Sequence, residues 1–143
     1  LIHNTSQLKK TLTLHTKKEW LVQEFVKAKY EYKVITVGYK ALPVILRYKF
    51  NKKIGRVDFK EHKALFLPLE GGGEEGVKKV IMIAEKASKV LGRELSKIDI
   101  LEDYMGKLYI LEVNRFPGLK SFEELTGFNV AGEFVKYLEK CYN

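Results

Sequence analysis

The sequence predicts an α+β fold in which an antiparallel β-sheet is flanked by helices. Three patterns indicate it: polar–apolar alternation over residues 30–50, apolar residues at helical spacing over 77–91, and a β-like hairpin over 97–114. Of the 143 residues, 45% are hydrophobic and 31% are charged. This balance is typical of one folded domain with a core and excludes a disordered chain.

The first half is expected to contain one helix and three strands. Residues 6–12 predict a short helix capped by Thr5 or Ser6. The strands should form an antiparallel meander with a turn at Gly38, and they are predicted over residues 20–26, 30–39 and 41–50.

The second half begins with its least regular part. Residues 51–76 end in a glycine cluster over residues 70–76, with Gly71, Gly72 and Gly73, and such a cluster predicts a mobile loop. A strong amphipathic helix should follow, with Gly92 at its C-cap. After the hairpin, Pro117-Gly118 predicts a turn and Ser121 begins a capping box. Asn129 is expected to cap a last helix.

Charge is distributed unevenly along the chain, whose formal net charge is +8. Residues 1–60 contain fourteen Lys and Arg against four Asp and Glu, whereas residues 61–143 contain twelve against fourteen. The basic half could face the phosphates of a nucleotide or of a nucleic acid, or it could be a solvated lysine-rich surface.

Several classes of protein are disfavoured by residue content. Cys141 is the only cysteine, which excludes an internal disulfide and a cysteine-based zinc site and agrees with a cytoplasmic setting. His3, His15 and His62 show no metal or triad spacing. No apolar run approaches the length of a membrane span, so we expect no membrane partner.

The hairpin gathers acidic residues on one face. If its centre lies between Met105 and Gly106, Asp99 falls opposite Glu112, and directly opposed residues point to the same face. Asn114 lies two residues beyond Glu112 and shares that face. Opposed acids repel, and a divalent cation would resolve the repulsion; hard oxygen ligands suit Mg²⁺ or Mn²⁺.

The other face of the hairpin should fix its register. Ile98, Ile100, Leu111 and Val113 are expected to be buried there, because a slip by one residue would bury the acids instead. An exposed hairpin face that happens to be acidic is the plain alternative to a metal site.

The residues around the hairpin resemble a known family. An Asp99 strand, the strand Glu112-Val113-Asn114, the Pro117-Gly118 turn and the helix start over residues 126–131 look like the end of RimK-like ATP-grasp ligases, which join carboxylates to amines. The resemblance implies the C-terminal part of an ATP-grasp fold. It also implies that Asp99, Glu112 and Asn114 hold the Mg²⁺ ions that bridge the ATP phosphates.

A second block agrees with this resemblance. Residues 21–26 are similar to the family's hinge strand along the adenine, and would present to the base Gln23, Glu24, Phe25 and Val26. Glu31 lies where the family binds the ribose hydroxyls, in a stretch that also looks like D-alanine–D-alanine ligases. Alternation places Lys33 on the same strand face as Glu31, so both could reach one ligand.

Two arginines are candidates for the reacting groups. By resemblance, Arg47 matches a basic position aimed at the phosphates and the reacting carboxylate, and Arg115 follows the metal ligands directly. A charged outer sheet face for Arg47 and an exposed turn for Arg115 are the plain alternatives.

The resemblance covers roughly residues 1–140 but has gaps. The family's strand with an ATP-binding lysine and its glycine-rich phosphate loop have no counterpart, so we expect a single partial domain. Residues 1–26 would end the central subdomain, and residues 27–143 would form the C-terminal subdomain. Residues 56–76 also depart from the family pattern, which leaves the acceptor-substrate site undefined.

The expected function is ATP- and Mg²⁺-dependent formation of an amide or peptide bond through an acylphosphate, with this fragment inactive by itself. The partners would be small-molecule or peptide carboxylates and amines, and homo-oligomer formation stays open. A non-catalytic nucleotide-binding or assembly module is the alternative. Nucleic-acid binding is less favoured, because alternating tyrosines in a strand are more often core residues; here they are Tyr30, Tyr32, Tyr39 and Tyr48.

Overall fold

The computed structural model describes residues 2–14, 19–51, 56–67, 75–115 and 117–142. Its helices and strands, in chain order, are α1 (Thr5–Leu14), β1 (Ala28–Val37), β2 (Lys40–Asn51), β3 (Arg56–Phe66), α2 (Glu75–Val90), β4 (Leu95–Asp103), β5 (Leu108–Asn114), α3 (Leu119–Thr126) and α4 (Val130–Tyr142). None of these helices combines the length and the apolarity needed to cross a bilayer.

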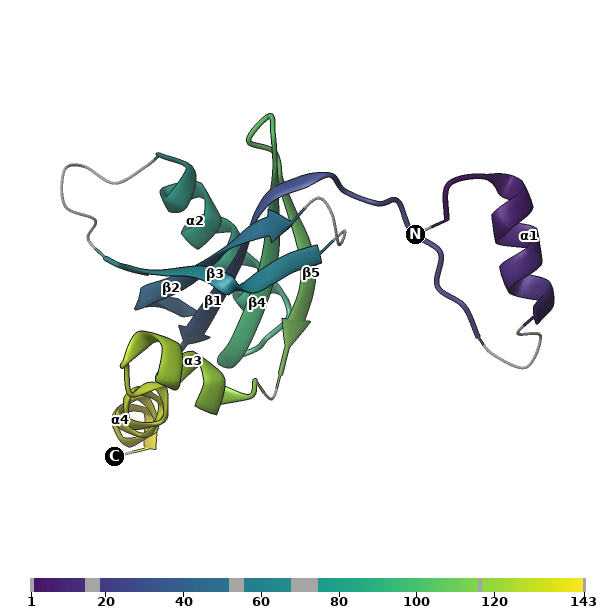
Figure 1. Ribbon diagram of the computed structural model, residues 1–143. Coiled ribbons are helices and arrows are strands. Elements are labelled where there is room, and N and C mark those ends of the chain that lie inside the picture. The colour runs from purple at the N-terminus through teal and green to yellow at the C-terminus, as the bar shows by residue number, and fades with distance from the viewer. Residues whose placement is uncertain (1, 15–18, 52–55, 68–74, 116, 143) are drawn as a thin grey trace.

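One antiparallel sheet organises the molecule, with the strand order β3-β2-β1-β4-β5. Helix α2 packs on one face, and α3 and α4 pack on the other (Figure 1). The fold is therefore α+β with a helix-flanked antiparallel sheet, as the sequence predicted. The central strands β1 and β4 have side chains covered on both faces, which gives the functional residues on them a fixed frame.

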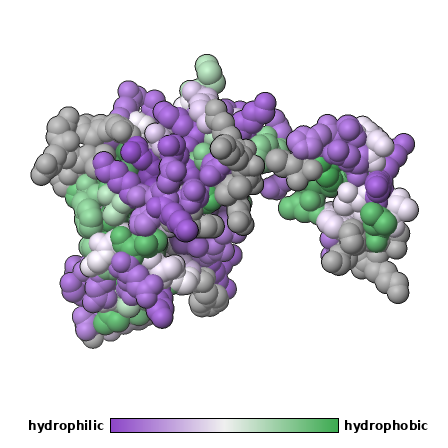
Figure 2. Space-filling view, viewed as in Figure 1, coloured by the Kyte–Doolittle hydropathy of each residue, from purple (hydrophilic) through white to green (hydrophobic). Residues whose placement is uncertain are grey.

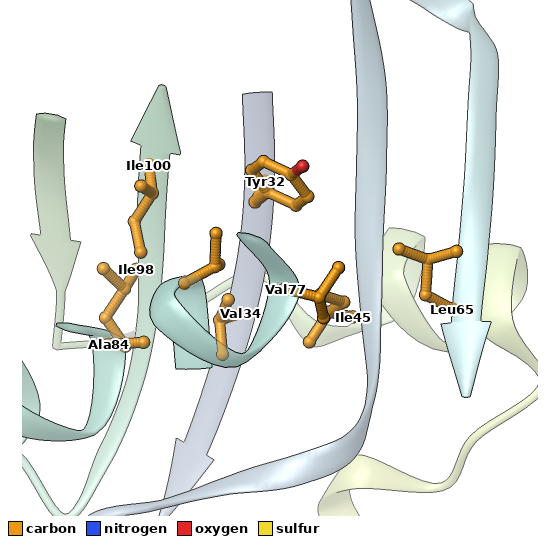
Figure 3. Packing of buried hydrophobic residues seen from close by; sticks show 9 residues of the cluster. Tyr32, Val34, Ile45, Leu65, Val77, Ala84, Ile98 and Ile100 are labelled. Atoms are coloured by element: carbon orange, nitrogen blue, oxygen red, sulfur yellow. The ribbon is translucent and has the colours of Figure 1, made fainter. Parts of the chain in front are cut away.

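Alternation along each strand builds two cores. On the α2 face, Val34, Ile98 and Ile100 have no exposed surface and pack against α2 (Figure 3). On the opposite face, Ile35 and Val44 pack with Phe122 of α3 and Val130 of α4. Because the side-chain period of a strand is two, residues with odd numbers on β4, among them Asp99, lie on the α3 and α4 side.

One turn and two helix caps lie where the sequence predicted them. Gly38 and Tyr39 both have positive φ angles, 57° and 67°, and join β1 to β2 as a two-residue turn. Gly92 has φ 60° and ends α2 in a Schellman arrangement, in which its N–H donates to the Lys89 carbonyl. The Asn129 side chain accepts from the Gly132 N–H at 2.7 Å and caps α4.

Two expectations about caps were wrong. The side chain of Asn4, rather than Thr5 or Ser6, accepts from the Gln7 N–H at 2.9 Å at the start of α1. The helix α3 begins earlier than the capping box at Ser121 implies, with Gly118 as a cap that offers no side-chain hydrogen bond.

Two expectations about strands were also wrong. Residues 20–26 have no regular structure, because no strand pairs with them; Leu21 is 85% exposed. The third strand of the meander is instead β3, within the stretch expected to be irregular. As an edge strand β3 carries many charged residues, which masks its alternation. Gly71, Gly72 and Gly73 lie outside the described residues.

Helix α1 and the irregular segment over residues 19–27 extend away from the sheet (Figure 1). Apolar side chains gather on this part of the molecule (Figure 2). Several are exposed although they are large: Ile2, Leu12, Trp20, Leu21, Val22 and Phe25.

Candidate functional site

The acid pair predicted from the hairpin is present. Asp99 on β4 lies directly opposite Glu112 on β5, and Lys97 lies opposite Asn114. The Asn114 side-chain amide donates to Glu112 Oε1 at 2.7 Å, so Asn114 and Glu112 do share a face. The two carboxylates and the amide therefore meet at one place on the hairpin, here called the acidic platform.

The register that produces this platform contains a β-bulge. Asp99 pairs with Glu112, but Ile100 pairs with Ile110, so Leu111 has no partner on β4. The uniform register that we expected holds only on the Asp99 side of this bulge. Leu111 is 46% exposed rather than buried, whereas Ile98 and Ile100 are fully buried as expected. Bulges often re-aim side chains next to functional sites, and this one directly precedes Glu112.

A lysine from the neighbouring strand completes the platform. Lys33 on β1 lies opposite Asp99 in the sheet, with its Nζ 3.0 Å from Asp99 Oδ2 and 2.9 Å from Glu31 Oε1. The three side chains are only 8 to 15% exposed. Glu31 and Lys33 therefore lie on one strand face, as alternation predicted.

Sequence reasoning missed a second lysine. Lys97 lies two residues before Asp99 on the same strand face, and its Nζ is 4.0 Å from Asp99 Oδ2. Its side chain is 20% exposed. The spacing of Lys97 and Asp99 could have indicated this contact, but the resemblance assigned a role on this strand to Asp99 alone.

Burial and nearby charges shift the pKa values of the platform residues in different directions. Burial raises the pKa of Asp99, the nearby charge of Glu31 adds to this, and Lys33 opposes it. Burial by itself would lower the pKa of Lys33, but the hydrogen bond to Glu31 and the charge of Asp99 outweigh it and raise that pKa. The hydrogen bond from Asn114 is the main reason why the pKa of Glu112 is lowered.

The donor atoms of the platform fit a divalent cation. Asp99 Oδ1 is buried and has no hydrogen-bond partner, while Oδ2 faces the lysines. An orphaned carboxylate oxygen next to Glu112 is the kind of hard ligand that Mg²⁺ or Mn²⁺ prefers. Among the described residues no group of three His, Cys, Asp or Glu could hold a metal. A cation here would therefore take further ligands from a bound molecule and from water.

A cavity of about 350 Å³ lies beside the platform, between the sheet and α3. Lys33 and Lys97 both line it, and the Lys33 ammonium lies 5.6 Å from the centre of the Tyr48 ring. The other lining residues are Leu46, Gly118, Ser121, Phe122 and Leu125. Two lysine side chains thus line a cavity whose walls are otherwise largely apolar.

The structure does not bring the other predicted residues to this place. Arg47 pairs with Tyr32 on the α2 face of the sheet, and its guanidinium lies 4.7 Å from the centre of the Tyr30 ring. It cannot reach the same ligand face as Lys33 and Asp99, and sequence reasoning missed this because it did not assign β2 residues to faces. Arg115 is exposed directly after β5.

The adenine-side candidates lie in the irregular segment before β1. Gln23, Glu24 and Phe25 are exposed and line a hollow of about 640 Å³ with α1. Val26 is half-buried. The Phe25 ring lies 6.1 Å from that of Phe50, which packs on the α3 and α4 side of the sheet. The segment therefore reaches the same side of the sheet as the platform.

Comparison with known proteins shows which family part of this chain is similar to. Residues 75–138, which include Asp99, Glu112 and Asn114, match a family model described as a RimK-like ATP-grasp domain. This match covers 64 of the 143 residues, so the similarity to the family is shown for that part of the chain. A "Probable alpha-L-glutamate ligase" of Stutzerimonas stutzeri strain A1501 is 35% identical over 130 residues, which are 87% of this chain and 39% of that protein. The chain thus spans about two fifths of that relative.

Solved ATP-grasp ligases share the fold. D-alanine–D-alanine ligase of Bacillus anthracis, complexed with ATP, has a TM-score of 0.61 at 18% identity, covering 96% of this chain and 47% of that one. The ligase PsnB, complexed with a variant of its minimal precursor, Mg and ADP, has a TM-score of 0.58 at 17% identity, covering 82% and 34%. The helix-flanked sheet of this chain is thus part of an ATP-grasp fold.

Proposed function

We propose that the chain is the C-terminal part of an ATP- and Mg²⁺-dependent ligase that joins a carboxylate to an amine through an acylphosphate. The observation that carries the proposal is the divided environment of the Asp99 carboxylate. Its Oδ1 is buried without a partner beside Glu112, and its Oδ2 accepts from Lys33. The RimK-like match supports the proposal because it contains both acids.

Asp99, Glu112 and Asn114 are the proposed ligands of Mg²⁺ or Mn²⁺. When bound, the metal would neutralise phosphate charge and orient the phosphate oxygens. The protein's own contribution on the same face is Lys33, which Glu31 holds in position at 2.9 Å. A fixed ammonium in a largely water-excluded site stabilises negative charge that develops on a transferring phosphoryl group.

The remaining candidates are assigned by their place in the fold. We propose that the adenine lies along residues 23–26, whose backbone has no strand partner and can offer N–H and C=O groups. Glu31 would reach the ribose hydroxyls, and Arg115 would contact a phosphate. Arg47 receives no such role in the proposal, because it lies on the opposite face of the sheet.

The proposed reaction has two steps. A substrate carboxylate oxygen bonds to the γ-phosphorus of ATP, the bond between that phosphorus and the bridging oxygen breaks, and ADP leaves. The substrate amine then bonds to the acyl carbon, gives up a proton, and displaces phosphate. Positioning and charge neutralisation are the tasks left to the protein.

Substrates and domain extent are part of the proposal. A glutamate ligase and a precursor-bound ligase among the similar proteins support an amino-acid or peptide substrate. Residues 1–26 are proposed to end the central subdomain and residues 27–143 to form the C-terminal one. We further propose that the chain alone is inactive, since it contains no recognisable glycine-rich phosphate loop.

The test is MgATP binding by isothermal calorimetry and ADP release, measured on a protein extended upstream to the length of its relatives. Asp99→Asn should lose most of the MgATP binding, while Asp103→Asn, an acid at the hairpin end, should keep it. Equal MgATP binding by the wild type and Asp99→Asn would refute the proposal. Binding without ADP release under any supplied carboxylate and amine would favour a non-catalytic module.

A further inference from the structure

Lys97 adds a second ammonium group to a carboxylate that already has one. Its Nζ is 4.0 Å from Asp99 Oδ2, and the Lys33 Nζ is 3.0 Å from the same oxygen. Both lysine side chains are at least four-fifths buried, at 20% and 15% exposure. Two ammonium groups therefore lie near Oδ2 of Asp99, whereas Oδ1 has no hydrogen-bond partner.

With a divalent cation bound, the charges of this site balance only when an anion is also present. Three carboxylates, those of Glu31, Asp99 and Glu112, face two ammonium groups, so the site carries one net negative charge. A divalent cation alone would turn this into one net positive charge in a partly buried place. Uncompensated charge of this kind is unfavourable where the dielectric is low. Without Lys97, the same cation would leave the site neutral.

The cavity beside the platform gives an anion a place to bind. Lys33 and Lys97 line this space of about 350 Å³, together with the rings of Tyr48 and Phe122. Apolar walls strengthen the attraction between the ammonium groups and a phosphate or carboxylate group. An anion there would lie on the Oδ2 side of Asp99, and the cation would lie on the Oδ1 side.

We propose that Lys97 makes divalent-metal binding at Asp99 and Glu112 depend on a phosphate-bearing ligand, so that the metal alone binds weakly and the two bind cooperatively. This rests on the proposed function, because it uses the same metal platform. Lys97 acts as a positioning residue. Its charge lowers the affinity of the site for a bare cation, and an anion bound beside it restores that affinity. By linkage, the metal strengthens phosphate binding by the same factor.

The probes for the test are Mn²⁺, followed by electron paramagnetic resonance, and inorganic phosphate, with the weak Mn²⁺–phosphate complex measured in protein-free titrations. Lys97→Met should bind bare Mn²⁺ about tenfold more tightly than the wild type, since it removes one repelling charge. Saturating phosphate should tighten Mn²⁺ binding to the wild type about tenfold, within the usual range of coupling between sites. That gain should be much smaller in Lys97→Met.

Two further variants make the outcomes distinct. Lys120→Met removes an ammonium that is 89% exposed on α3, and it should leave bare Mn²⁺ binding as in the wild type. Lys97→Arg keeps the charge and should retain the phosphate dependence; it also serves if Lys97→Met does not fold. Equal bare Mn²⁺ affinity in the wild type and Lys97→Met, or an equal phosphate effect in both, overturns the proposal. Failure of the proposed metal site gives a different result. In that case Asp99→Asn would bind Mn²⁺ as the wild type does.

Discussion

Lys33 and Asp99 lie opposite each other on the neighbouring central strands β1 and β4, and their charged groups are 3.0 Å apart. Both side chains are largely buried, so each depends on the other for charge compensation. Lys33→Met should therefore lower the free energy of unfolding by about 2–4 kcal/mol, because it leaves buried carboxylates without their ammonium partner. Urea denaturation monitored by circular dichroism measures this change.

The double variant Lys33→Met with Asp99→Asn separates pairing from packing. Removing the charge of Asp99 should recover part of the stability that Lys33→Met loses, which a double-mutant cycle reports as a coupling energy. If the two losses simply add, the ion pair contributes nothing to stability and the side chains act only by packing.

Gly38 is required by the turn between β1 and β2 for two separate reasons. Its φ of 57° lies in the left-handed region, and a Cβ there would also overlap the ring of Tyr137 on α4. Gly38→Ala should destabilise the fold by about 2–3 kcal/mol, of which backbone strain supplies about 1–2 kcal/mol. Thermal unfolding of purified variants is the measurement.

Gly106 provides the matched control for this turn. It also has a positive φ, 80°, but no atom lies within 4 Å of a Cβ placed there. Gly106→Ala should therefore show only the strain, about 1–2 kcal/mol. Equal losses at the two glycines would mean that the Tyr137 ring moves aside without a penalty.

The β-bulge at Leu111 can be tested by substitution on the hairpin. Leu111 is 46% exposed, so Leu111→Thr should change the free energy of unfolding by no more than about 0.5 kcal/mol. Ile98 has no exposed surface on the adjacent strand, so Ile98→Thr should lower it by about 2–4 kcal/mol. Chemical denaturation of the two variants decides the register, because a regular hairpin would bury Leu111 and make both changes severe.

Much of the site could be predicted because its signals are local. The opposition of Asp99 and Glu112 needs only a hairpin and an estimate of its centre, and the burial of Ile98 and Ile100 follows from alternation. The bulge at Leu111 could not be predicted, because the pattern of apolar and polar residues in the strand does not mark where an extra residue is inserted.

Contacts between distant strands explain the remaining misses. The Lys33–Asp99 pair depends on β1 lying next to β4, and the two partners are 66 positions apart in the sequence. The failure at residues 20–26 has the related cause that a strand needs a partner, and β-like composition supplies none. Arg47 was assigned to the phosphates from its position along the chain, whereas the strand pairing places it opposite Tyr32, on the other face from Lys33.

The turn of the acidic hairpin should respond to pH through Asp103. Its carboxylate accepts from the backbone N–H groups of Lys107 and Met105, at 2.9 Å and 2.8 Å, and from the hydroxyl of Tyr109 at 3.2 Å. The bond from the Lys107 N–H is the main cause of a lowered pKa at Asp103. Because the folded-state pKa lies below the unfolded value of about 3.9, the stabilisation is complete above that value.

The stabilisation from Asp103 should then be lost as the pH falls through the lowered folded-state pKa. Carbon-detected nuclear magnetic resonance of the Asp103 carboxyl should give a midpoint below that of an ordinary aspartate. Asp103→Asn should lower the melting temperature at pH 7, and this effect should shrink as the pH falls and the wild-type carboxyl becomes protonated. A titration midpoint for Asp103 at or above about 3.9 would contradict the role of these backbone hydrogen bonds in the turn.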